Sequence, residues 1–215
     1  MIGTNIPLTD KFIEAYPPYK VRYMQLDPKS LIEYKLTINK ICNRISYDYN
    51  QLIGIITEIK PMLNDRHFVE MLLNKLIDQG RVLVSNHLNS YKPISILMSK
   101  LYEHNSQILD VYVRLIIRKE CKITEINGIY SIYFGVLVLL KDYERAWFIL
   151  VSILNIEPNQ YTGHVLEYYF LICSPLLETK KKRLFKLKKY LNDFFYPKIS
   201  NIAIETRIRE YLNKI

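Results

Sequence analysis

The sequence predicts an all-α fold of stacked antiparallel helical hairpins, similar in shape to a HEAT-type array. The chain of 215 residues contains only 6 glycines, which leaves few places for the tight turns of an all-β fold. Apolar residues recur with helical spacing along most of the chain, whereas the alternation typical of strands is weak. Short connections between successive helical segments favour antiparallel neighbours. No internal sequence repeat accompanies this pattern, so the array is predicted from shape alone.

A single domain is expected, because hydrophobic residues make up 49% of the chain and no linker or low-complexity tract divides it. Residues 1–26 contain Pro7, Pro17 and Pro18, and we expect them to form an extended N-terminal segment on the surface. Residues 27–215 then form the helical domain.

The first predicted helix begins where Asp27 precedes Pro28, since a carboxylate can cap a helix and proline at the first position loses no hydrogen bond. Asp48 opens the second helix, and Pro61 stops it. The apolar residues expected on the inner faces are Leu31, Ile32, Leu36, Ile38 and Ile41 in the first helix, and Leu52, Ile53, Ile56 and Ile59 in the second.

Asp65 is expected to cap a third helix with Phe68, Leu72, Leu73 and Leu76 in the core. Gly80 either ends this helix or kinks it before residues 82–87. Later helices are expected at residues 93–103, 106–119, 124–140, 142–155, 158–177, 179–196 and 200–214. Residues 129–140 have the propensity of a strand, but their length and flanks favour a buried helix.

Charge and cysteine content restrict the environment and the partners. The formal net charge of +9 favours anionic partners such as nucleic acid, inositol phosphates or acidic protein surfaces, although it also fits simple solubility. Cys42, Cys121 and Cys173 are few and widely spaced, which is typical of buried thiols in a reducing compartment. The longest apolar run, near residues 133–140, is too short to span a membrane, and the N-terminus lacks a secretory signal pattern, so no membrane insertion is expected.

The strongest charge feature is the run from Lys180 to Lys189. On a helix, one face would carry the core residues Leu184, Leu187, Leu191 and Phe194. The cations expected to form a basic face for a partner or for RNA are Lys180, Lys182, Arg183, Lys186 and Lys189. Two interpretations stay open at this point: a solvated helix face, or a contact for RNA phosphates or an acidic protein.

No catalytic or metal-binding pattern is present in the sequence. The four histidines are scattered, no Cys/His spacing fits a zinc site, and no glycine-rich phosphate loop occurs. We therefore expect a protein that is not an enzyme and holds no metal. Trp147, the one tryptophan, is expected to be a core anchor. Asn155 is expected to end one helix in a left-handed conformation, and Pro158 to begin the next.

An ordered set of short motifs extends from Asn74 to Ile199. It comprises Lys75-Leu76-Ile77-Asp78-Gln79-Gly80, His87, Pro93-Ile94, Tyr102-Glu103, Asp110, Arg118-Lys119, Trp147, Leu154-Asn155-Ile156-Glu157-Pro158 and Tyr196-Pro197-Lys198-Ile199. In its order and spacing this set resembles the C-terminal helical domain of the GLE-one family of nuclear-pore mRNA-export mediators.

The resemblance implies a regulator and not a catalyst. Members of that family bind a DEAD-box RNA helicase at the cytoplasmic face of the nuclear pore, separate its two lobes, and so speed RNA release and ATP turnover. An FG-repeat nucleoporin docks on the domain, and relatives are linked to translation as well as to export. A nuclear-pore or cytoplasmic location is therefore expected. The alternative from the residues alone is a basic helical protein bound directly to RNA or to a ribonucleoprotein such as the ribosome.

The resemblance also implies an inositol hexakisphosphate site. Arg118 and Lys119 match the paired basic element near the family's phosphate pocket. The other cations expected to complete the site are Lys75, Arg114 and Lys122. Asp78 departs from the family pattern, which places a basic residue before Gln-Gly, and a carboxylate there opposes polyanion binding.

Overall fold

The computed structural model describes residues 27–118, 122–199 and 201–215, and the expected extended segment 1–26 lies outside them. In the described part of the chain every regular element is helical and no strand occurs, which confirms the all-α prediction. The α-helices are α2 (Pro28–Cys42), α3 (Tyr49–Ile59), α4 (Arg66–Gln79), α5 (Tyr91–His104), α6 (Ile108–Arg118), α7 (Ile123–Leu140), α8 (Tyr143–Leu154), α9 (Thr162–Leu177), α10 (Lys181–Tyr190) and α11 (Ile202–Asn213).

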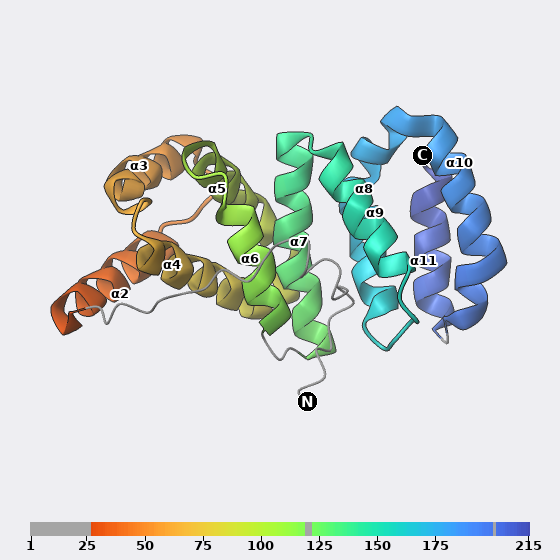
Figure 1. The fold of residues 1–215 in the computed structure, drawn as a ribbon, viewed down its shortest axis with the longest axis horizontal. Coiled ribbons are helices and arrows are strands. Elements are labelled where there is room, and N and C mark those ends of the chain that lie inside the picture. The colour runs from red at the N-terminus through yellow and green to blue at the C-terminus, as the bar shows by residue number, and fades with distance from the viewer. Residues whose placement is uncertain (1–26, 119–121, 200) are drawn as a thin grey trace.

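The helices are stacked so that elements two places apart in the chain pack side by side. One layer contains α3, α5, α7, α9 and α11, and α2, α4 and α6 pack together in a second layer. Figure 1 shows the resulting row, from α2 and α3 at one end to α10 and α11 at the other. Between α7 and α8 the chain reverses at Lys141, which has a left-handed backbone (φ 53°). The packing agrees with stacked helical hairpins, and the comparison with HEAT arrays stays a prediction.

Three of the helix starts are capped by aspartate side chains. Asp48 accepts a hydrogen bond from the Asn50 N–H (2.9 Å), and Asp65 accepts one from the His67 N–H (2.8 Å). Asp142 caps α8 in the same way. Asp27 precedes α2 with Pro28 at the first position, as predicted, but its side chain makes no capping hydrogen bond. The helix starts were therefore readable from the sequence even where one cap is not formed.

Buried apolar side chains form one cluster that extends from Ile38 in α2 to Leu212 in α11. Most of the predicted inner residues are buried, but Ile32, Leu36 and Ile53 are exposed, and Leu31 is only partly buried. In α2 the fully buried residues, such as Ile38 and Ile41, lie in the C-terminal half, and Tyr34 before them packs its ring on Phe68 of α4. In α3 Leu52, Ile56 and Ile59 are buried as predicted, and Ile55 takes the fourth core position in place of Ile53.

The central helix is α7, which packs on α5, α9 and the segment after α4. In the described part of the chain it is the one helix that is long and apolar enough to cross a membrane by length and composition. Most of its side chains are buried against its neighbours, as in the core helix of a folded domain. It forms as a helix, as expected, in spite of its β-branched and aromatic content.

Two π-helical turns interrupt the regular helices. Gly80 does not end the chain's third helical segment, because α4 continues into the π-helical turn Gly80–Val84. The second π turn, Leu191–Phe195, follows α10. The extra residue in this wider turn shifts the inner face by one position, so Phe195 is 2% exposed and Phe194 is 61% exposed. The prediction that Phe194 is a core residue is therefore wrong.

The connection from α8 to α9 also differs from its prediction. Asn155 has a right-handed backbone (φ −85°), and α9 begins at Thr162 instead of Pro158. Asn159 organises the intervening loop, because its side-chain oxygen accepts hydrogen bonds from the backbone N–H groups of Tyr161 (2.9 Å) and Thr162 (3.2 Å). An Asx turn has replaced the expected glycine-like helix end and proline start.

Candidate binding surface on α10

The basic run folds as α10, at the end of the helical row opposite to α2 (Figure 1). The expected inner residues Leu184 and Leu187 are buried, and Leu191 follows them into the core. The predicted cations Lys180, Lys182, Arg183, Lys186 and Lys189 are all exposed, and we call these five residues the basic surface. Because no acidic residue lies between Lys180 and Lys189, no carboxylate of this helix offsets their charge.

Two members of the basic surface contact α8 through its aromatic rings. The Lys180 ammonium lies 5.2 Å from the centre of the Tyr143 ring, and the Arg183 guanidinium lies 5.4 Å from the same ring. Arg183 also lies 5.5 Å from the centre of the Trp147 ring. These distances are within the range of cation–π attraction. Lys180 and Arg183 therefore help to hold α10 against α8, in addition to carrying charge.

Trp147 is partly buried, so the prediction of a core anchor is only half correct. Its ring stacks on Tyr143 with the ring centres 6.1 Å apart and the planes 17° apart. Its remaining surface lines a groove between α8 and α10, with Val151, Leu154 and Leu187. We call this the α8–α10 groove; its volume is about 230 Å³.

The α8–α10 groove has an apolar floor and a cationic edge. Arg183 and Lys186 lie along its α10 side. At one end the Tyr190 hydroxyl donates a hydrogen bond to the Leu154 carbonyl oxygen (3.2 Å). At the other, Arg183 lies 3.4 Å from a carboxylate oxygen of Glu144. Both contacts join α8 to α10.

A second row of side chains faces away from the groove. Lys182, Phe185 and Lys189 follow one another at helical spacing and are exposed, Phe185 by 73%. We call these three residues the outer stripe. Phe194 lies beyond them, with its ring centre 5.6 Å from that of Tyr190. Sequence analysis missed these exposed aromatic rings, although Phe185 stands out of step with the buried leucines and could have been recognised from that spacing.

The residues expected to bind inositol phosphate have different neighbours. Lys75 in α4 lies near the Cys42 thiol. Burial raises the pKa of this thiol to about 11, although the positive charge of Lys75 acts to lower it. Arg114 in α6 lies near Asp110. Burial raises the pKa of the Asp110 carboxyl, and the charges of Arg145 and Arg114 lower it by less. Lys122 precedes α7. Lys119 and the side chain of Arg118 lie outside the described residues. The three cations Lys75, Arg114 and Lys122 thus come from α4, from α6 and from the residue before α7.

Carboxylates accompany the Lys122 end of this set. Glu125 accepts a hydrogen bond from the Lys122 backbone N–H (3.0 Å), and Arg81 lies 3.0 Å from the same carboxylate. Burial raises the pKa of Glu125, but the Lys122 N–H and the Arg81 guanidinium outweigh it and hold the pKa below its usual value. Asp78 lies 3.7 Å from Arg81. Arg81 therefore offsets part of the negative charge that Asp78 introduces.

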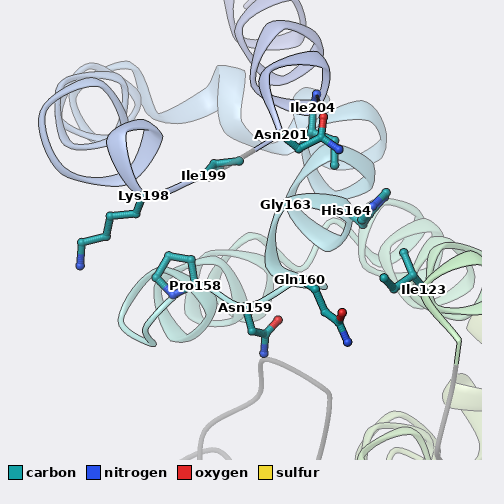
Figure 2. A pocket seen from close by; sticks show the side chains of 10 residues that line it. All are labelled: Ile123, Pro158, Asn159, Gln160, Gly163, His164, Lys198, Ile199, Asn201 and Ile204. Carbon is teal, nitrogen blue, oxygen red and sulfur yellow. Dashed lines mark hydrogen bonds between the residues drawn. The ribbon is translucent and has the colours of Figure 1, made fainter.

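A larger polar pocket of about 420 Å³ lies where α7, α9 and α11 begin, as Figure 2 shows. Its lining includes Gln160, His164 and Asn201. The one lysine in the lining, Lys198, extends away from His164 in Figure 2, and its ammonium lies 3.2 Å from Glu157. The pocket thus lacks a cation directed into it among the residues that line it.

Within the described residues, no group of three His, Cys, Asp or Glu side chains could hold a metal ion. The exposed cations of α10 and the apolar groove beside them make this region the candidate surface for a macromolecular partner. No protein-family model, no curated protein and no solved structure matches this chain.

Proposed function

We propose that this protein acts by binding an anionic macromolecule through the basic surface, as an mRNA-export factor that resembles the GLE-one family. Its partner on this proposal is a DEAD-box RNA helicase, which it binds and activates at the cytoplasmic side of the nuclear pore. The observation that carries the proposal is the row of exposed cations on α10, which no carboxylate on that helix offsets. The choice of a helicase follows from the ordered motifs between Asn74 and Ile199.

The proposed action requires no chemistry by this chain. A helicase alternates between open and closed arrangements of its two lobes, and a protein that binds the open form more tightly increases the population of that form. Faster opening releases RNA sooner and so raises the rate of ATP turnover. A stack of helices with a continuous apolar core supplies a firm support for such a binding surface.

The test is the RNA-stimulated ATPase rate of the mRNA-export helicase with this protein added. We expect stimulation by the natural chain and its loss in the double variant Lys182→Glu, Lys189→Glu. A matched control carries Lys29→Glu and Lys92→Glu, which make the same charge change at exposed positions on α2 and α5. Equal stimulation by all three proteins would exclude Lys182 and Lys189 of the basic surface as the contact.

Direct binding to RNA, free or within a ribonucleoprotein such as the ribosome, is the second candidate. The observation that favours it is the exposed ring of Phe185 between Lys182 and Lys189, because aromatic rings among cations stack bases while the cations bind phosphates. In that case affinity for a single-stranded RNA would fall steeply with salt and would drop on Phe185→Ala, while the helicase rate would not change. A helicase regulator shows the opposite pattern: stimulation of the helicase and weak affinity for free RNA.

The remaining partners come from the resemblance alone. Inositol hexakisphosphate would be held by Lys75, Arg114, Arg118, Lys119 and Lys122, and an FG-repeat nucleoporin would bind elsewhere on the domain. Titration calorimetry with the hexakisphosphate tests the first, and absence of heat would remove it from the proposal. A pull-down with the nucleoporin alone tests the second and would favour an adaptor role.

A further inference from the structure

We infer that the α8–α10 groove is a docking site for an acidic amphipathic helix of a partner protein. This inference rests on the proposed binding role and specifies the segment of the partner that is bound. The apolar floor would receive leucine-like side chains, and the cationic edge would face glutamate or aspartate. This is the helix-in-groove mode of recognition, in which apolar anchors at helical spacing enter a groove between two helices.

The size and lining of the groove favour a peptide over a small molecule. Its volume of about 230 Å³ is below the ~300–1,000 Å³ that is typical of small-molecule sites. Val151, Leu154 and Leu187 present mainly carbon to it. A groove of this size and lining can bury a few apolar side chains of a protein partner.

The positive charge around the groove favours a partner segment with negative charge. Lys186 stands at the edge, and the described part of the chain contains no ion pair between Lys186 and a carboxylate. Arg183 forms an ion pair with the Glu144 carboxylate, and 46% of the Arg183 side chain is still exposed to solvent. Lys182 and Lys189 add positive charge on the next face of the helix. An apolar peptide flanked by carboxylates therefore complements the groove, and a basic one is repelled.

The aromatic geometry disfavours RNA in this groove. A base needs an open ring face for stacking, but the Trp147 ring stacks on Tyr143 and Arg183 lies over it. Phe185, whose ring is open, belongs to the outer stripe and is not part of the groove lining. RNA would thus bind the outer stripe, whereas the helical segment of a protein partner would occupy the groove.

Trp147 provides the readout, because it is the one tryptophan of the chain and lines the groove. The full chain is titrated with a synthetic helical peptide that has leucines at positions i, i+3, i+4 and i+7 and glutamates between them. We expect a saturable shift of the Trp147 emission to shorter wavelength. Three further probes are a scrambled peptide of the same composition, a peptide with lysine in place of glutamate, and a single-stranded oligouridylate.

Matched variants test the edge and the floor separately. Lys186→Glu should weaken binding about tenfold, the change that ~1.4 kcal/mol produces, whereas Lys29→Glu at an exposed position on α2 should leave affinity within about twofold. Val151→Phe fills the floor without a change of charge and should also abolish the shift.

An equal response to the scrambled peptide or to oligouridylate would overturn the inference, as would equal effects of the two lysine variants. The helicase assay described above distinguishes failure of the groove inference from failure of the proposed function. If the peptide fails to bind while the outer-stripe variant still loses stimulation, the groove inference is wrong and the proposed function stands.

Discussion

The backbone of Gly128 in α7 lies directly against that of Gly80 at the end of α4. A Cβ placed on Gly128 would come within 2.0 Å of the Gly80 carbonyl oxygen and 2.8 Å of the Ser85 backbone nitrogen. Backbone atoms cannot yield to such an overlap, so α7 and the π-helical turn Gly80–Val84 would have to separate.

We therefore expect Gly128→Ala to lower the free energy of unfolding by about 1–3 kcal/mol. Gly54→Ala is the matched control, because no atom lies within 4 Å of a Cβ at that position in α3. There alanine should raise the free energy of unfolding by about 0.5–1 kcal/mol, since glycine weakens a helix interior. Urea unfolding followed by circular dichroism measures both, and a Gly128→Ala protein as stable as the Gly54→Ala protein would refute the close contact.

Arg183→Ala should expose Trp147. The Arg183 guanidinium lies over the indole, so its removal lets water reach the ring and shifts the emission to longer wavelength. Lys182→Ala removes a cation from the neighbouring outer stripe and should leave the spectrum unchanged. If both spectra match the natural protein, the ring is not covered by Arg183 in solution.

The His164 side chain should make stability depend on pH. Burial lowers its pKa, the charge of Arg207 lowers it further, and the carboxylate of Glu167 opposes them. The unfolded chain binds a proton near the usual pKa of about 6.5, while the folded protein does so only at lower pH.

The contribution of His164 is therefore complete above about pH 6.5 and is lost as the pH falls toward the lower folded pKa. We expect the free energy of unfolding to decrease over this interval in the natural protein and to decrease less in His164→Gln. Urea unfolding at a series of pH values measures both slopes. Identical slopes would show that His164 is not responsible.

Cys42 and Cys173 should react slowly with iodoacetamide in the folded protein at pH 8. Both thiols are buried, and burial raises the pKa of Cys42 to about 11 and that of Cys173 further. The thiolate is the reactive form, so both access and ionisation oppose alkylation. Mass spectrometry of digested samples, with a sample labelled in urea as the reference, gives the rate for each residue. Equal rates with and without urea would contradict the burial of these thiols.

Much of the fold could be predicted from local chemistry. Asp48 and Asp65 mark helix starts because a carboxylate caps free N–H groups, and this interaction depends only on residues close in the chain. The π turn after α10 could not be predicted in the same way, because helical spacing assumes a constant number of residues per turn. For that reason Phe195, and not the predicted Phe194, is the buried residue.

Only part of the candidate surface could be predicted from the sequence. The run from Lys180 to Lys189 identified the cations, and Leu184 and Leu187 identified the buried side. The groove needs α8 and α10 to lie beside each other, which no pattern within either helix specifies. The position of Trp147 at the edge of the core, and not inside it, is likewise a consequence of which helices meet.

The stacking of helices two places apart has a consequence for synthesis in the cell. Because the main packing partners of each helix are close in sequence, a hairpin can find its neighbours before the rest of the chain has left the ribosome. Assembly can thus advance from α2 toward α11 as translation proceeds. The helix that carries the basic run, α10, emerges after α2 to α9, so the basic surface forms only when the layers that support it are already in place.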